Sequence, residues 1–272
     1  MSEQKPQLDL TELHQCELEI LVYFRELCCR YGLRYFLTAG TLLGAVRHGG
    51  FIPWDDDVDV AMPRKDYGRL AKIMKSNTDT DYYYQDGRSD KSFPFYFAKL
   101  RSKRYRVYER FFENSDINDG CYIDIFPLDR CPKNKSAAKL YFKINLFFTT
   151  VLMKKAAPDY PIGYRKKAVI ALFKLVKLFP VGAVKFFREA SRRMFFGGRL
   201  CTIGGVHGYP NESYDRDWFG AGELIDFEGE SFCVPVGREK LLESMYGDYM
   251  KFPDEKERLG HFIKIEKGEN RL

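Results

Sequence analysis

The spacing of hydrophobic residues changes several times along this chain. Over residues 9–31 apolar positions recur every three or four residues, the period of one helix face, and Asp9 and Glu12 stand at capping-box spacing. Further helices are predicted over 42–48 and 63–74. Alternating apolar and polar residues predict strands over 35–38, 57–60, 82–84, 95–101, 105–109 and 121–126. The pattern therefore mixes helices and strands.

The middle of the chain is predicted to be helical and basic. Residues 140–152, 169–179 and 183–196 carry apolar residues at helical spacing, but each run is far shorter than the ~18 apolar residues of a membrane-spanning helix. From residue 133 to 199, sixteen Lys and Arg stand against two acids, a net charge of +14, so the rest of this +6 chain carries −8. Such helices can lie on an anionic membrane, or they can pack on one another with their lysines in solvent.

Composition excludes several classes of protein. With 30% charged and 45% hydrophobic residues among 272, the chain is expected to fold around an ordinary core. The seven cysteines lack metal-ligand spacing and the start MSEQKPQLDL lacks the apolar stretch of a signal peptide, so we expect reduced thiols and a cytoplasmic protein. Nucleic acid is not an expected partner, because the basic residues interleave with apolar helix faces and no nucleic-acid motif occurs.

Candidate chemistry concentrates in residues 38–62. Asp57 and Asp59 alternate with valines, so in a strand both carboxylates point to one face. Two such carboxylates suit Mg²⁺, which prefers oxygen ligands and is usually held together with substrate phosphates. Asp124, an acid within a second apolar strand pattern, is the expected third ligand. The layout predicts a metal-dependent phosphoryl or nucleotidyl transfer site.

Groups that could bind substrate phosphates lie around these acids. Gly40 and Thr41 stand at the predicted start of a helix, where free amides can bind phosphate. Arg47 follows on the same helix. Lys99 and Arg101 lie on a predicted strand, either as pyrophosphate ligands or as solvated residues of a strand edge.

The base that accepts the proton of the acceptor hydroxyl has several candidates. His48, His261 and Asp124 could serve, although a lone histidine is more often structural. Asp55, at the alternate position with the paired acids, and Asp56 are expected either to support the metal ligands or to be exposed.

Three stretches resemble a known family. They are AGTLLGAVRHGGFIPWDDDVDVAMPRKDY, YIDIFPLD, and YGDY followed by Arg258 and His261. They are similar to the LicD family of phosphocholine transferases, which resembles nucleotidyltransferases in fold and also resembles fukutin and fukutin-related protein, transferases of ribitol phosphate. The resemblance implies an α+β fold with a nucleotidyltransferase-like mixed β-sheet core flanked by helices and a basic helical insertion.

The same resemblance implies a reaction and a metal site. By position, the paired metal acids of the family fall on Asp57 and Asp59 and the further acid on Asp124, with Mg²⁺ or Mn²⁺ as the implied cofactor. The implied reaction transfers phosphocholine from CDP-choline to a hydroxyl of a cell-surface glycan precursor, such as teichoic acid, lipopolysaccharide or another lipid-linked oligosaccharide, and releases CMP.

We expect three parts in the chain. They are a catalytic core over 1–132, a basic amphipathic helical subdomain facing the acceptor or membrane over 133–199, and a carboxy-terminal segment packing on the core over 200–272. The expected location is the cytoplasm, with peripheral contact to the inner face of the cell membrane.

Aromatic residues could hold the choline group, because ring faces attract cations. Candidates for such a cage are Tyr82, Tyr83, Tyr84, Phe93, Phe95, Tyr96, Tyr108, Phe111 and Phe112. Asp116 or Asp119 could complement the choline charge.

Three alternatives stay open. Ribitol phosphate, glycerol phosphate or another phospho-group carried by CDP could replace phosphocholine. A glycosyltransferase also uses an Asp-x-Asp pair to hold a metal, but it needs neither the Gly-Thr turn nor a separate acid strand. A binding module without catalysis would use the basic helices to dock on a membrane or partner.

Overall fold

The computed structural model describes residues 10–77, 81–109, 119–161, 163, 166–194, 197–202, 208–254 and 262–267. Its helices are α1 (Leu10–Tyr31), α2 (Ala39–Arg47), α3 (Arg64–Ser76), α4 (Lys135–Ala156), α5 (Lys167–Lys177), α6 (Val181–Met194), η1 (Arg216–Trp218) and α7 (Arg238–Tyr246). Its strands are β1 (Phe36–Leu37), β2 (Asp59–Pro63), β3 (Tyr82–Gln85), β4 (Ala98–Glu109), β5 (Gly120–Cys131), β6 (Arg199–Thr202), β7 (Ser213–Asp215), β8 (Glu223–Phe227), β9 (Glu230–Val234) and β10 (Phe262–Lys267).

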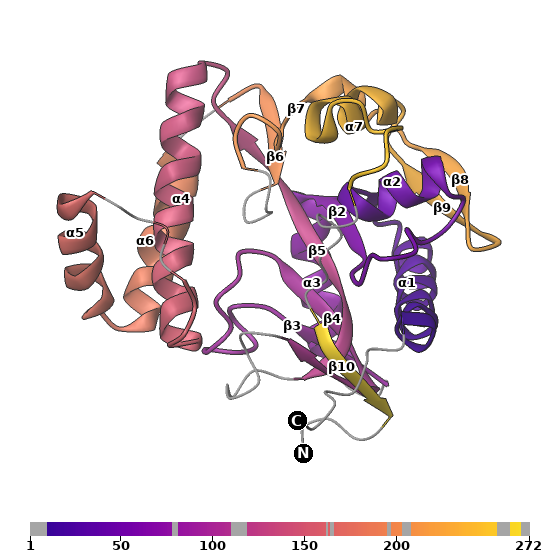
Figure 1. Ribbon diagram of the computed structural model, residues 1–272, viewed down its shortest axis with the longest axis horizontal. Coiled ribbons are helices and arrows are strands. Elements are labelled where there is room, and N and C mark those ends of the chain that lie inside the picture. The colour runs from indigo at the N-terminus through magenta and orange to yellow at the C-terminus, as the bar shows by residue number, and fades with distance from the viewer. Residues whose placement is uncertain are drawn as a thin grey trace.

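One mixed sheet organises the fold, with the long strand β5 at its centre (Figure 1). Its path runs β1-β2-β5-β4-β10, and β3 joins β4, β6 joins β5 and β7 joins β6. β2 and β5 are parallel, whereas the other pairs are antiparallel. β8 and β9 form a separate hairpin. This mixed sheet flanked by helices confirms the nucleotidyltransferase-like fold that the sequence motifs imply.

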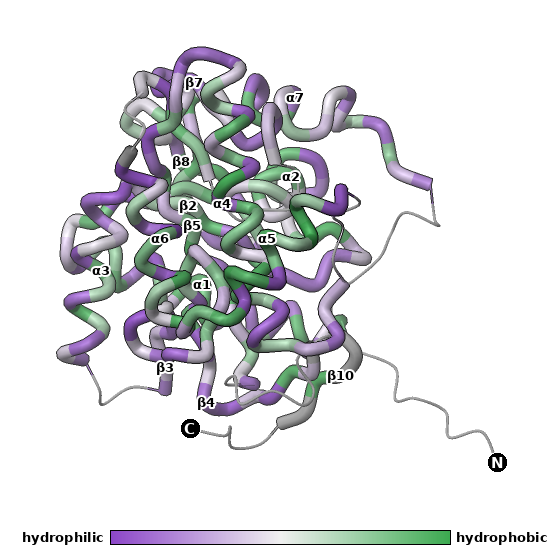
Figure 2. The backbone as a smooth tube through the Cα atoms, turned by 90° about the vertical axis from the view of Figure 1, so that its left-hand side faces the viewer, coloured by the Kyte–Doolittle hydropathy of each residue, from purple (hydrophilic) through white to green (hydrophobic). Residues whose placement is uncertain are grey.

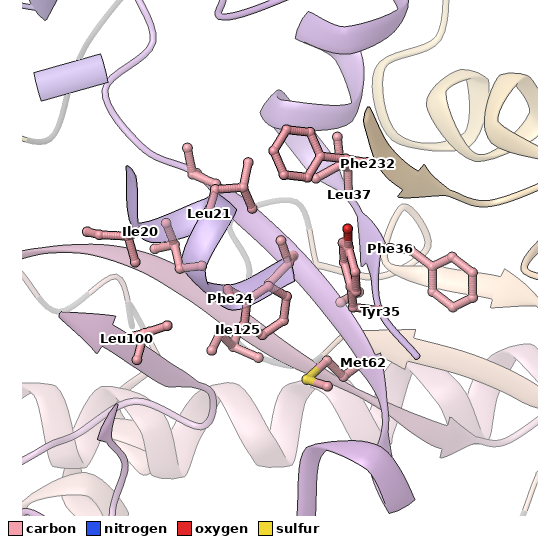
Figure 3. Close-up of a cluster of buried hydrophobic side chains, with 14 of the residues drawn as sticks. Ile20, Leu21, Phe24, Tyr35, Phe36, Leu37, Met62, Leu100, Ile125 and Phe232 are labelled. Carbon is pink, nitrogen blue, oxygen red and sulfur yellow. The ribbon is translucent and has the colours of Figure 1, made fainter. Parts of the chain in front are cut away.

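Helix α1 covers one face of the sheet and confirms the helix predicted over 9–31. Its apolar stripe includes Ile20, Leu21 and Phe24, each 0% exposed. Figure 3 shows this stripe in the same buried cluster as Leu100 of β4 and Ile125 of β5. Fully burying one such side chain stabilises the fold by roughly 1.5–3 kcal/mol, so α1 anchors the apolar face of the sheet.

Strand β4 differs from the sequence pattern. Separate strands are predicted over 95–101 and 105–109, but the structure has one strand that begins at Ala98. Its pairing with β5 shifts register between Arg101 and Arg106. The polar residues that interrupt the pattern therefore form an irregularity within a continuous strand, since a local shift of register preserves the pairing on either side.

Helices α4, α5 and α6 form what we call the helical module, beside the sheet (Figure 1). The inner faces of the three helices share a buried apolar cluster. It includes Val151 of α4, Phe173 of α5 and Val184 of α6. This packing confirms that apolar faces of the module pack on one another. Within the described residues, no helix has both the length and the hydrophobicity needed to cross a membrane.

The helical module is attached to the core by cations of α6. Lys185 donates hydrogen bonds to three backbone carbonyl groups of residues 87–91, at 2.9–3.3 Å. Arg188, which is buried, donates to the carbonyl oxygens of Pro94 and Phe95 at 2.7 and 3.1 Å. The interpretation that the basic residues of this region are simply solvated is therefore wrong for α6, because one face of the helix uses its cations as donors to backbone carbonyl groups of the core.

Candidate active site

A row of polar residues, which we call the acid row, crosses the sheet at one level. Asp59 of β2 lies opposite Asp124 of β5, and Lys99 of β4 lies opposite Asp124 on the other side. Gln85 of β3 continues the row opposite Lys99. Directly opposed residues project to the same face of a sheet, so the two predicted acids come together beside a lysine.

The ammonium group of Lys99 is buried in this row. Its Nζ lies 3.1 Å from Oδ1 of Asp124, in an ion pair whose two side chains are almost fully covered. The same nitrogen lies 3.1 Å from the ring centroid of Tyr122, 5.1 Å from that of Phe95 and 5.8 Å from that of Phe97. Ring faces attract a cation, so carboxylate and aromatic rings together compensate the burial of the lysine.

Asp59 lies in an electrostatically unfavourable position. Burial raises the pKa of this carboxyl well above its usual value, and the charges of Asp57 and Asp124 raise it further. Lys99 acts in the opposite direction on the same pKa but does not outweigh these causes. The backbone N–H of Asp59 donates to Oγ1 of Thr41 at 2.7 Å, which ties the start of β2 to α2.

The loop before β2, which we call the acid loop, carries a dense group of acids. Asp55, Asp56 and Asp57 each offer a carboxylate oxygen, and these oxygens lie within 4.8 Å of one another. The sequence pattern predicts that Asp57 and Asp59 alternate on one strand. In the structure β2 begins only at Asp59, so Asp57 approaches the row from the loop. Asp56 is 1% exposed, so the expectation of an exposed residue is wrong there.

This donor set fits a hard divalent cation. All of its groups are carboxylates, which are the ligands that Mg²⁺ and Mn²⁺ favour. Like charges at this density are costly to bury unless a cation neutralises them. The close grouping of the three loop carboxylates beside Asp59 is the geometric feature that fits such a cation, and the pKa of Asp59, raised first by burial and then by Asp57 and Asp124, agrees with it.

Helix α2 meets the acid loop at its first turn. The helix begins at Ala39, three residues before its predicted start at 42, so Gly40 and Thr41 belong to its first turn, where backbone N–H groups have no partner within the helix. A Cβ atom on Gly40 would lie 2.5 Å from Oδ2 of Asp55, so only glycine lets this carboxylate lie against the helix start. Phosphate binding by these amides stays a prediction.

Helix α1 contacts the acid loop through His14 and places the buried Glu17 near it; the sequence pattern singles out neither residue. His14 Nε2 hydrogen-bonds to the backbone oxygen of Asp55 at 2.8 Å, and its ring stacks on Phe51 at 4.0 Å between centroids. Glu17 is fully buried, and no other described residue hydrogen-bonds to either of its carboxylate oxygens. The signal that could have found Glu17 is its place on the apolar stripe of α1.

Glu17 adds to the negative charge under the loop. Burial raises the pKa of this carboxyl well above its usual value, and the charge of Asp57 raises it further, followed by Cys16 and Asp56. The carboxylates of this region also act on the pKa of Tyr246, which belongs to the carboxy-terminal YGDY stretch. Burial raises its pKa first, and Asp59 raises it next.

Arg47 and His48 lie at the end of α2 under aromatic cover. Arg47 donates to the backbone oxygen of Tyr249 at 2.7 Å and lies over the ring of Phe252, 4.8 Å from its centroid. His48 packs edge-on against Trp54 and Phe252. Burial and the charge of Arg47 lower the pKa of His48, so its imidazole is neutral at pH 7 and able to accept a proton.

The other expected site residues have varied surroundings. Arg101 is fully buried and donates to Oε1 of Gln85 and to the carbonyl oxygen of Gly120, both at 2.6 Å. The alternative that Lys99 and Arg101 are solvated residues of a strand edge is therefore wrong, whereas pyrophosphate binding stays a prediction. His261 lies outside the described residues.

Several candidates for a choline cage already contact other side chains of the protein. Phe95 faces the Lys99 ammonium, and the Tyr96 hydroxyl donates to Asp129 at 3.2 Å. Asp119, a candidate counter-charge, pairs with Arg106 at 2.6 Å. Phe111, Phe112 and Asp116 lie outside the described residues.

A mixed sheet that brings an acid loop, a helix start and a third acid together defines a nucleotidyltransferase-like domain. Residues 32–147 match the family model described as "LicD/FKTN/FKRP, nucleotidyltransferase domain". The chain is 30% identical over 267 residues to lipopolysaccharide cholinephosphotransferase LicD of Haemophilus influenzae, covering 94% of this chain and 97% of that protein. A stretch of 42 residues is 50% identical to human ribitol 5-phosphate transferase FKRP, covering 15% of this chain and 8% of that protein.

This chain belongs to the LicD family. It is accordingly an enzyme of phosphoryl-group transfer, as its motifs imply.

Proposed function

We propose that this enzyme transfers phosphocholine from CDP-choline to a hydroxyl of a cell-surface glycan precursor and releases CMP. The observation that carries the proposal is the meeting of Asp59 and Asp124 on neighbouring strands with Asp57 in the adjoining loop. The choice of phosphocholine and of a lipopolysaccharide-type acceptor is supported by the printed activity of the Haemophilus influenzae relative. We place the reaction in the cytoplasm, at the inner face of the membrane.

Asp57, Asp59 and Asp124 would hold Mg²⁺, or Mn²⁺ in its place. Held by these residues, the cation would supply positive charge to offset the phosphates of the donor and the charge that develops on the departing CMP. The carboxylates of Asp57 and Asp124, which together with burial raise the pKa of Asp59, are the groups that such a charge would balance.

The remaining residues position the two substrates. Gly40 and Thr41, in the first turn of α2, present backbone amides toward donor phosphates. Asp124 orients or deprotonates the acceptor hydroxyl, and His48, kept neutral by burial and Arg47, is the second candidate for this proton. The acceptor oxygen forms a bond to the phosphorus that carries choline, and the bond between that phosphorus and the CMP oxygen breaks. Positioning and charge neutralisation dominate such a transfer.

The test is release of CMP from CDP-choline by the purified protein with Mg²⁺, with and without a glycolipid extract. Release that requires both metal and extract, and that is lost in Asp57→Asn, supports the proposal. Release without metal, or near-normal release by Asp57→Asn, contradicts the metal assignment. If no CDP donor yields CMP, the result favours a binding module without catalysis. Release of sugar from a nucleotide sugar would indicate a glycosyltransferase.

Transfer of ribitol phosphate or glycerol phosphate is the second candidate function. Two observations favour it: 42 residues of the chain are 50% identical to a ribitol 5-phosphate transferase, and the rings of Phe95, Phe97 and Tyr122 already surround the Lys99 ammonium. These three ring faces beside the acid row therefore already hold a cation of the protein itself. CMP release from CDP-ribitol or CDP-glycerol, but not from CDP-choline, would keep the site and change the donor.

A further inference from the structure

Helix α5 has two apolar faces, of which only one is packed. Phe173 is buried and Val176 is partly buried, and both join the shared cluster of the helical module. On the opposite side, Leu172 and Leu175 are exposed, and Leu178 just after the helix is 81% exposed. The spacing of three residues from one leucine to the next places all three on one face. Packing within the module requires only one apolar face of α5, so it does not explain the second face.

The exposed apolar side chains continue onto α6. Phe179, in the turn after α5, lies edge-on to Phe187 of α6 with 6.5 Å between ring centroids, and Phe187 contacts Phe186 at 5.8 Å. Phe186 is 67% exposed. We call these six residues the outer apolar surface: Leu172, Leu175, Leu178, Phe179, Phe186 and Phe187. An exposed apolar patch of this kind marks a site of interaction.

The location of this surface suits contact with a large flat partner. In Figure 1, α5 lies at the edge of the molecule, beyond α4 as seen from the sheet. Figure 2 looks onto that side, and α5 faces the viewer there with hydrophobic stretches of tube. The surface is therefore presented outward, away from the core.

The charges around the outer apolar surface decide which partner it fits. Lys167, Lys174 and Lys177 are exposed on α5, and on the helical wheel they fall together on one flank of the apolar face. Neither α4 nor α5 contains an Asp or Glu. Lysines with long apolar stems beside exposed leucines are typical of helices that lie in the interface of an anionic bilayer. A second copy of this chain would bring the same positive charge to the contact, which disfavours self-association.

We propose that the outer apolar surface inserts into the headgroup region of an anionic membrane, with the lysines of α5 binding lipid phosphates. The cations of α6 that face the core are engaged in attaching the module, as the bonds of Lys185 and Arg188 to backbone carbonyl groups show. A membrane contact at α5 is thereby connected to residues 87–95 through the shared packing of the helical module, and Phe95 at the end of that segment lies beside Lys99 in the acid row. The inference does not depend on which phospho-group the enzyme transfers.

The first experiment measures insertion directly. Leu178→Trp is compared with Leu224→Trp in the full-length protein, because Leu224 is 74% exposed on the β8–β9 hairpin at the opposite end of the molecule. Phosphatidylcholine vesicles with and without phosphatidylglycerol are the probes. We expect a blue shift of emission for Leu178→Trp with the anionic vesicles and no shift for Leu224→Trp. Equal behaviour of the two variants would overturn the proposal.

The second experiment measures affinity by sedimentation with the same vesicles. Leu178→Glu is expected to weaken binding at least tenfold, and Leu224→Glu to leave it unchanged. Each lysine of α5 replaced by glutamine should weaken binding about fivefold, an effect that falls as salt rises. Wild-type protein that does not bind anionic vesicles refutes the proposal. So does a wild-type dimer that Leu178→Glu dissociates, because the surface would then serve a second copy. Circular dichroism confirms that each variant is folded.

Discussion

The acid row and the helical module break the ordinary distribution of residues in opposite ways. In the row, charged groups such as Asp124 and Lys99 are inside the protein. In the module, apolar groups such as Leu178 and Phe186 are outside. Buried charges and exposed apolar surface both cost stability in the isolated chain. The comparison teaches that the two regions need opposite ligands: the cation proposed for the acid row and the membrane proposed for the helical module would each remove the cost in its own region.

The largest effect is expected from removing a charge in the row. Asp59→Asn should reduce turnover by about a thousandfold or more, because the proposed metal would lose a ligand and the donor phosphates would lose the charge that it supplies. The fold should be retained or stabilised, since burial and neighbouring acids already raise the pKa of Asp59. Turnover by CMP release and the thermal midpoint are measured on the same preparation. A loss of turnover that only follows unfolding would mean that the row is structural.

Removing the buried cation should be costly for stability. Lys99→Met leaves Asp124 without its ion-pair partner, at a cost of about 3–5 kcal/mol. Combining it with Asp124→Asn should recover part of the loss, because no uncompensated charge remains. A double-mutant cycle in denaturant unfolding measures the coupling. If the two losses simply add, the pair contributes little to the row.

Glu17 should make the stability depend on pH. Its folded-state pKa is raised by burial and then by Asp57, so the folded protein holds a proton that the unfolded chain has lost, and stability falls as the pH rises above the ordinary value of 4.5. Glu17→Gln should therefore stabilise the protein by about 1.4 kcal/mol for each pH unit between the two pKa values, and should have no effect below them. Unfolding at several pH values checks this. A constant difference between the two proteins would show that Glu17 does not titrate as proposed.

The attachment of α6 should contribute a smaller amount. Arg188→Ala removes two hydrogen bonds from a buried guanidinium to the carbonyl groups of Pro94 and Phe95 and should cost about 2–3 kcal/mol. Arg193→Ala on the same helix is the control, because that side chain is 70% exposed. Denaturant midpoints compare the two. Equal midpoints would mean that the module is held by its apolar contacts alone.

The smallest effect on stability is expected at the outer apolar surface. Leu178→Gln should change the unfolding free energy by less than about 0.5 kcal/mol, because the side chain is mostly in water already. Chemical denaturation without vesicles measures it. A loss of several kcal/mol would show that Leu178 is covered by the protein, which would remove the contrast with the acid row.

Much of the active-site layout could be predicted from local pattern. Asp57, Asp59 and Asp124 stand out as acids within apolar strand patterns, and the structure does bring β2 and β5 together. The position of Glu17 beside the acid loop could not be predicted, because helical periodicity indicates which residues lie inward but not what lies across from them. The burial of Lys99 and Arg101 was missed because a strand pattern does not reveal that β3 covers the outer side of β4.

The sequence by itself determined the family, the presence of a mixed helical and strand fold, and the concentration of positive charge in the middle of the chain, because each depends on residue order and on short-range periodicity. Only the tertiary structure decided which charges are paired. It placed Lys99 between Asp124 and aromatic rings, directed the cations of α6 onto backbone carbonyl groups, and left one apolar face of α5 uncovered. The physical reason is that burial and Coulomb interactions depend on neighbours distant in sequence, and strand pairing and helix packing bring these neighbours together.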